Sequence, residues 1–182
     1  MAELTLVPPL ARFIFQGGPV ACKTASDAFR LVLSEKPCRA NAGVSRAALW
    51  LGPDEYLLLA PADEMRAIAV ELTAALAGTP HSLVDVSARQ VAWRLCGADA
   101  STLLNSGCPL DLDPEEFPPG MCTRTILGKA QIVLWRKAAE EYHLEIWRSY
   151  SDYVRDFLLD AARSDWAERT SEGDDHAQRS AG

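Results

Sequence analysis

The sequence has few of the residues that build metal and redox sites. It contains three histidines in 182 residues, and none of its five cysteines lies in a Cys-x-x-Cys pair. Zinc clips and thioredoxin-like sites depend on such closely spaced ligands, so we expect neither. The cysteines are read as reduced thiols that serve mostly as small core residues: Cys22, Cys38, Cys96, Cys108 and Cys122.

Long apolar runs and clustered positive charge are also missing. No stretch approaches the roughly 18 apolar residues of a membrane-spanning helix. The residues from Met1 to Leu4 show no basic region leading into an apolar core, so we expect no secretory signal. The formal net charge of −7 and a pI near 5.0 offer no positive footprint for phosphates. We therefore expect a cytoplasmic protein that binds neither membrane nor nucleic acid.

Glycine-rich nucleotide motifs are absent from the sequence as well. Neither Gly-x-Gly-x-x-Gly after a strand nor Gly-x-x-x-x-Gly-Lys-Ser/Thr occurs. Gly17 and Gly18 do stand between a predicted strand and a predicted helix, where an anion could meet free backbone N–H groups. Pro19 follows at once and removes one of these donors, so a simple turn is favoured.

Two segments have the apolar periodicity of amphipathic helices. The first covers residues 63–77, with Asp63 as a plausible N-cap. The second covers residues 149–163, with Ser149 or Ser151 as the cap. Shorter helices are predicted at residues 24–29 and 99–106. Helices of this kind cover one face of a sheet.

Alternating apolar residues and β-branched or aromatic content predict eight strands. Two turn sequences, Leu51-Gly52-Pro53-Asp54 and Leu127-Gly128-Lys129, join neighbouring strands into hairpins. The predicted strands cover residues 12–16, 47–51, 55–60, 83–87, 90–96, 121–127, 130–136 and 142–148.

The order of these elements repeats along the chain. Each half gives a strand, a glycine, a helix, a proline, a strand, a Leu-Gly turn, further strand and a long helix. We predict an α+β fold of duplicated βαββα units, with mainly antiparallel sheets covered by helices, in which pairing of the units extends the sheet. Residues 1–165 are expected to form a single compact domain with halves at about 10–78 and 82–163. Residues 166–182, polar and acidic, are expected to be a disordered tail.

His143 and Glu145 are the most suggestive polar pair. Residues two apart on a strand point the same way, so these side chains share one face and could begin a metal site. No third ligand is evident, and a polar strand face or a contact surface is the favoured interpretation. Of the other histidines, His81 lies between a proline and a strand, and His176 lies in the tail.

Two further groups of polar residues are weak candidates for catalysis. A Ser-His-Asp arrangement could use Ser87, Asp85 and a histidine, but no Gly-x-Ser-x-Gly elbow supports it. Alternation with valines favours a half-buried strand there. Four carboxylates bracketed by prolines indicate an ordered extended loop, not an acid–base or calcium site: Asp111, Asp113, Glu115 and Glu116. The sequence assigns no catalytic, cofactor-binding or metal-binding residue.

Four of the five tryptophans fall on predicted strands: Trp50, Trp93, Trp135 and Trp147. Aromatic residues on strands are usually core, although buried Trp and Tyr also anchor protein interfaces. Trp147 is the strongest interface candidate, because it shares a strand face with His143 and Glu145 while Leu144 and Ile146 point to the other side.

Five blocks of sequence carry a resemblance to a known family. In order, they are residues 49–58 (LWLGPDEYLL), 85–87 (DVS), 107–112 (GCPLDL), 124–128 (RTILG) and 148–150 (RSY). Together they resemble the gamma subunit of heterotetrameric sarcosine oxidase, and the similarity extends from about Phe13 to Leu159.

This resemblance implies a fold like the folate-binding domain of the aminomethyltransferase T-protein. It also implies a complex that demethylates sarcosine to glycine, produces hydrogen peroxide and passes the one-carbon unit to tetrahydrofolate. In that family, FAD, NAD and FMN belong to the alpha and beta chains and zinc to the delta chain, so no cofactor is expected in this chain. The aminomethyltransferase signature Lys-Gly-Cys-Tyr/Phe-x-Gly-Gln-Glu does not occur, so folate binding is not carried over.

The sequence is therefore interpreted as a non-catalytic structural gamma subunit of an oxidoreductase complex. Its expected partners are alpha, beta and delta subunits, with alpha in direct contact. Two alternatives stay open: a stand-alone folate-dependent aminomethyltransferase-like protein, and a scaffold for another flavoprotein.

Overall fold

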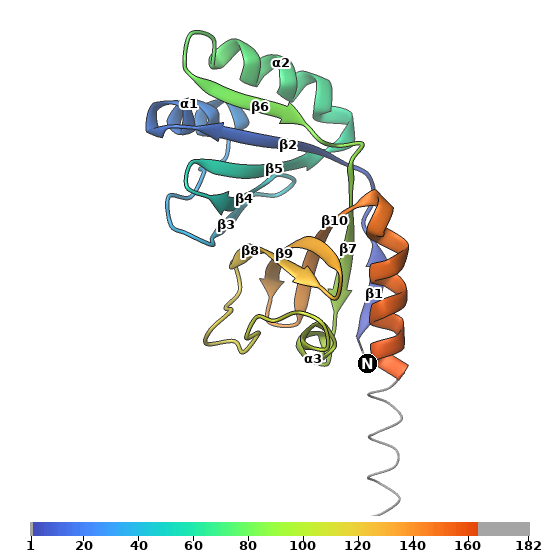
Figure 1. Cartoon of the computed structure of the whole chain (residues 1–182). Helices are drawn as coiled ribbons and strands as arrows, with labels where there is room; N and C mark the ends of the chain where they lie inside the picture. Colours follow the sequence, from blue (N-terminus) through green and yellow to red (C-terminus); the bar gives the residue numbers. More distant parts are fainter. Residues whose placement is uncertain (1, 164–182) are drawn as a thin grey trace, which may run out of the picture.

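Two five-stranded sheets face each other, and each carries helices on its outer side (Figure 1). The computed structural model describes residues 2–163. All strand pairings among them are antiparallel, and the mixed α+β class is as predicted. No helix in this described part is long and apolar enough to cross a bilayer.

The first sheet has the strand order β3-β4-β5-β2-β6. Its outer face is covered by helices α1 (Pro19–Phe29) and α2 (Met65–Ala75), which bury Phe29 and Leu72 against the sheet. A 3₁₀ turn, η1 (Ala62–Glu64), leads into α2. The strands are β2 (Leu10–Gly17), β3 (Ala40–Ala42), β4 (Ala47–Gly52), β5 (Glu55–Pro61) and β6 (His81–Asp85).

The second sheet has the order β1-β7-β10-β9-β8. Helix α3 (Ala100–Asn105) and the helix of residues 151–163 cover its outer face, and the 3₁₀ turn η2 (Arg148–Tyr150) precedes the latter. The strands are β1 (Glu3–Leu6), β7 (Gln90–Cys96), β8 (Cys122–Leu127), β9 (Ala130–Ala138) and β10 (Glu141–Trp147).

The two halves exchange one strand each. Strand β1 precedes the first unit in sequence but pairs with β7 of the second sheet. Strand β6 precedes the second unit but pairs with β2 of the first sheet. The connections at residues 7–9 and 86–89 therefore cross between the sheets, which ties the halves together beyond their face-to-face contact (Figure 1).

A third core fills the space between the sheets. It joins β4 and β5, through residues such as Leu49 and Leu57, to Cys122 of β8 and Trp135 of β9. The prediction that pairing of the units extends one sheet was wrong, because the apolar inner faces pack on each other instead. The sheet edges meet at an isolated bridge between Arg39 and Met121.

The predicted elements are present, and two short strands were missed. Strand β3 has three residues and β1 has four, mostly exposed, so neither has a strong apolar pattern. Each unit is consequently a βαβββα arrangement. Strand β6 was expected to be half-buried over residues 83–87, yet it ends at Asp85 and its residues are largely exposed at a sheet edge.

Local details of the helix starts also differ from the sequence expectation. Helix α2 has Glu64 at its N-cap position with no side-chain cap hydrogen bond, so Asp63 does not cap it. Ser151 is the first residue of the helix of residues 151–163, and its hydroxyl accepts a 3.0 Å hydrogen bond from Trp93 Nε1. Helix α1 begins at Pro19, five residues before the start predicted at residue 24, and Gly18 is its extended N-cap residue, so strand β2 passes into the helix without a separate turn. The predicted tail of residues 166–182 lies outside the described residues.

Candidate functional site

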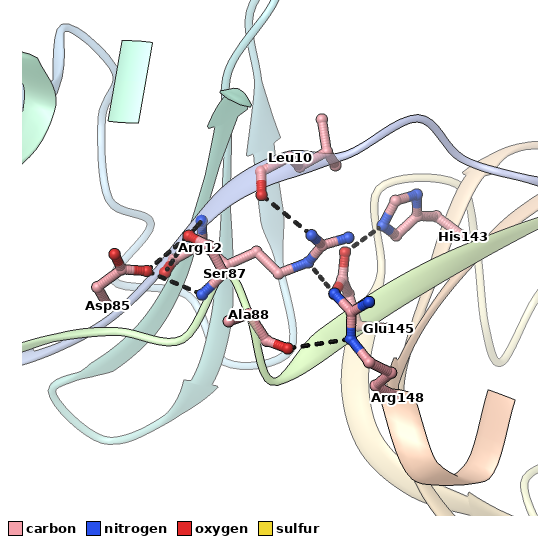
Figure 2. Close-up of polar contacts among 8 residues, drawn as sticks. All are labelled: Leu10, Arg12, Asp85, Ser87, Ala88, His143, Glu145 and Arg148. Atoms are coloured by element: carbon pink, nitrogen blue, oxygen red, sulfur yellow. Dashed lines mark hydrogen bonds and ion pairs between the residues drawn. The ribbon is translucent and has the colours of Figure 1, made fainter. Parts of the chain in front are cut away.

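A buried ion pair joins the two sheets at the centre of the molecule. Arg12 on β2 donates from Nε to Glu145 Oε2 on β10 at 2.6 Å (Figure 2). The Arg12 and Glu145 side chains are 2% and 0% exposed. Arg12 also donates from a terminal nitrogen to the Leu10 carbonyl at 3.1 Å. The charges are thus paired and hydrogen-bonded, as burial of ions requires.

His143 is hydrogen-bonded to the second oxygen of the same carboxylate. Its Nε2 lies 2.8 Å from Glu145 Oε1, and because an ionised carboxylate only accepts, Nε2 is the donor. The Trp135 ring packs against the imidazole with centroids 5.7 Å apart. His143 and Glu145 therefore share one strand face, as predicted, and this face is turned towards the other sheet.

The arrangement links the halves and leaves Glu145 no free oxygen for chemistry. Both carboxylate oxygens have partners, and the residue is fully buried. Among the described residues, no three His, Cys, Asp or Glu side chains gather into a cluster that could hold a metal. His143 and Glu145 therefore lie on a buried polar strand face, where they bond to each other and to Arg12.

Asp85 and Ser87 form a closed turn next to the ion pair. The Ser87 hydroxyl donates to Asp85 Oδ1 at 2.6 Å and accepts from the Arg12 backbone N–H at 2.9 Å. The same Asp85 oxygen accepts the Ser87 N–H at 2.8 Å. Figure 2 shows His143 bonded to Glu145 on the other side of Arg12. The serine, aspartate and histidine are not assembled into a catalytic triad.

The remaining sequence candidates lie apart from this centre. His81 is exposed, and its Nδ1 lies 2.7 Å from the Thr79 carbonyl; His176 lies outside the described residues. In the acidic loop, Asp111 and Asp113 each accept a backbone N–H two residues on, at 2.9 Å, while Glu115 and Glu116 are exposed. This is the predicted ordered loop, held by local turns.

Of the five cysteines, Cys108 and Cys122 are buried, and Cys22, Cys38 and Cys96 are partly exposed. All five are free. Burial between the sheets raises the pKa of Cys122 to about 12, and burial also raises the pKa of Cys22. Neither is therefore an activated nucleophile at neutral pH.

Two cavities flank the central network. One, of about 320 Å³, is lined by residues that include His143, Trp135 and Lys137. The other, of about 480 Å³, is lined by residues that include Glu145 and Trp147. Trp147 is 46% exposed, while the Trp135 ring is buried and its Nε1 has no partner within the described part.

Sequence reasoning missed Arg12, which is the partner that gives Glu145 its role. The available signal was a single charge inside the otherwise apolar run Leu10-Ala11-Arg12-Phe13-Ile14-Phe15. A charge in such a run indicates a buried pair, but the partner is 133 positions away and only the fold reveals it.

Comparison with known proteins gives the family. The family model "Sarcosine oxidase, gamma subunit family" matches residues 22–164, which is most of the chain. The chain belongs to the sarcosine oxidase gamma subunit family. The resemblance noted in the sequence is confirmed.

Relatives within the gamma subunit family are moderately similar. The chain is 36% identical over 115 residues to sarcosine oxidase subunit gamma of Corynebacterium sp. strain P-1, covering 63% of this chain and 56% of that protein. It is 35% identical over 122 residues to the Arthrobacter subunit, covering 67% and 59%. The chain thus spans just over half the length of these curated relatives.

Solved structures agree with this assignment. A chain of heterotetrameric sarcosine oxidase from Corynebacterium sp. U-96, in complex with pyrrole 2-carboxylate, matches with a TM-score of 0.83 at 28% identity, covering 90% of this chain and 84% of that one. The aminomethyltransferase T of the Bartonella henselae glycine cleavage system matches with a TM-score of 0.65 at 17% identity, covering 87% and 45%. The latter shows the aminomethyltransferase-like fold expected for gamma subunits.

Proposed function

We propose that this chain is a non-catalytic structural subunit of a heterotetrameric sarcosine oxidase complex, in which it contributes contact surface. The observation that carries the proposal is that the candidate polar residues bond to one another inside the fold. Arg12, Glu145 and His143 satisfy one another between the sheets, and Ser87 is held by Asp85. Membership in the gamma subunit family supports the same conclusion.

The proposed partners are alpha, beta and delta subunits, with alpha in direct contact and the assembly in the cytoplasm. FAD, FMN, NAD and zinc are proposed to belong to those chains. The complex would demethylate sarcosine to glycine with tetrahydrofolate as one-carbon acceptor and hydrogen peroxide as product. We assign no catalytic, cofactor-binding or metal-binding residue to this chain.

The chain is large enough for such an interface. A permanent hetero-complex interface buries roughly 2,000 Å² or more in total, about half of it from each side. The chain exposes 10116 Å² as a monomer. A contact of this kind would take about one tenth of its surface.

Co-expression tests the proposal. We expect the full chain to co-purify with alpha, beta and delta subunits and to melt at a higher temperature in the complex than alone, because binding to the native state stabilises it. A chain that stays monomeric and gains no stability in their presence would contradict the proposal. Calorimetric titration with folates tests the aminomethyltransferase-like alternative, which sub-millimolar binding would favour.

A further inference from the structure

The cavity of about 480 Å³ opens along one row of side chains on the inner face of the second sheet. Strand register places Trp147 opposite Gln90 and Ile126 opposite Gln131. Because Ile146 faces Ile132, the next pair in the ladder sets Trp147 beside Gln131. The four side chains Gln90, Trp147, Gln131 and Ile126 therefore cross the sheet in one line, and all four line the cavity.

The row is only partly covered by the first sheet. Ile14 and Leu57 of that sheet contribute apolar wall to the cavity. Trp147 and Ile126 nevertheless remain 46% and 44% exposed. Two large apolar side chains at the mouth of one cavity form an apolar surface with a concave floor, the form that binding sites for other molecules take.

Arg89 gives this surface a positive charge. Its guanidinium lies over the Trp147 ring, 5.5 Å from the centroid, and forms no ion pair within residues 2–163. Arg124 also lines the cavity and is bonded to Glu55. Glu145, the acidic residue of the lining, is already paired with Arg12. The uncompensated charge at the mouth is therefore that of Arg89.

Gln90 adds an unsatisfied polar group at the base of the row. The residue is 5% exposed, and its Oε1 has no hydrogen-bond partner in the described part of the chain. A buried acceptor without a donor costs free energy in the folded chain. An N–H group brought in by a bound molecule would remove this cost.

We propose that this surface, defined by Arg89, Gln90, Ile126, Gln131 and Trp147, is a docking site for an extended segment of a partner subunit. The segment would carry a carboxylate for Arg89, an apolar side chain for the space between Trp147 and Ile126, and a backbone N–H near Gln90. The inference rests on the proposed function and specifies its contact surface.

The chemistry of the row favours a polypeptide occupant. Trp and Arg are the residues that most often dominate interface energetics, and here they are stacked on each other. A carboxylate supplies the missing countercharge.

The test uses the full chain with co-expressed alpha, beta and delta subunits. Arg89→Glu and Trp147→Ala are each expected to weaken association at least tenfold, a loss of about 1.4 kcal/mol. The matched control is Val70→Glu, since Val70 is an exposed apolar residue on α2, outside the surface. It is expected to bind as the unaltered chain does.

Hydroxyl-radical footprinting of the unaltered chain provides a second measurement that does not depend on variant folding. Oxidation of Trp147 is expected to fall at least threefold in the complex, while oxidation of the peptide that contains Val70 stays constant. Unchanged Trp147 oxidation in an assembled complex would overturn the inference and leave the proposed function intact.

Other outcomes are equally decisive. If the unaltered chain does not assemble with these subunits, the proposed function itself fails. If Trp147 mediates self-association of the isolated chain instead, measured by light scattering, the occupant is a second copy and the inference is wrong. Binding by Arg89→Glu that equals that of the unaltered chain would refute the role of the charge.

Discussion

Replacing Arg12 by methionine removes one partner of a fully buried ion pair while keeping most of the side-chain volume. Glu145 would keep His143 but lose the cation that lies 2.6 Å from its Oε2. Breaking a buried pair on one side costs about 3–5 kcal/mol, because the remaining charge is left uncompensated. For a chain of this length each kcal/mol lowers Tm by about 2–4 °C, so we expect a drop of about 6–20 °C.

The double variant Arg12→Met with Glu145→Met separates two causes of the destabilisation. One is the loss of the attraction between Arg12 and Glu145, and the other is the cost of leaving the Glu145 charge buried without a partner. With both charges gone, most of the loss is expected to be recovered, since an apolar pair of similar volume is often neutral. A residual cost of about 1–3 kcal/mol remains because His143 Nε2 loses its acceptor. Urea denaturation followed by circular dichroism measures the free energy of unfolding for all variants.

The surface pair between Arg94 and Glu141 supplies the control. These side chains are 3.1 Å apart but 41% and 22% exposed. Arg94→Met, the same substitution in a solvated pair, is expected to cost much less than Arg12→Met, because solvent screens an exposed ion pair. If Arg12→Met costs no more than Arg94→Met, the reasoning that the central pair ties the sheets together is refuted.

Three further results are expected. The hydrogen bond from Arg124 lowers the pKa of Glu55, so Glu55→Gln should lower the free energy of unfolding by less than about 1 kcal/mol at pH 7. This difference in stability between the variant and the unaltered chain should vanish as the pH falls through the lowered pKa. A difference that does not change with pH would contradict this explanation. Gly107→Ala should cost about 1–3 kcal/mol in urea denaturation, because a Cβ would lie 2.5 Å from the Phe157 ring, and an unchanged midpoint would refute the contact. Burial raises the pKa of Cys122 to about 12, so iodoacetamide at pH 8 should alkylate the partly exposed Cys38 before the buried Cys122, as read by mass spectrometry.

Local sequence pattern was sufficient for most elements but not for the weakest ones. The hairpin around Gly128, which adopts φ +57°, follows from a turn sequence between two alternating strands. Strands β1 and β3 have too few residues to show a pattern, and they exist because a neighbouring strand offers free backbone groups to pair with. Such strands are determined by the neighbour more than by their own residues.

The sequence predicted only part of the central site of Arg12, His143 and Glu145, because local pattern does not show contacts between distant segments. Period-two geometry placed His143 and Glu145 on one face, because alternation is a property of the strand itself. It could not show that this face meets Arg12, since that contact depends on how the two sheets pack.

The sequence by itself determined the α+β class, the repeated order of elements and the family, because these depend on local periodicity and on ordered blocks of residues. The tertiary structure decided that the sheets stack face to face, that β1 and β6 cross into each other's sheets, and that Arg12 neutralises Glu145. These are long-range choices, fixed by which apolar faces and which charges must be removed from water together. No single segment carries that information.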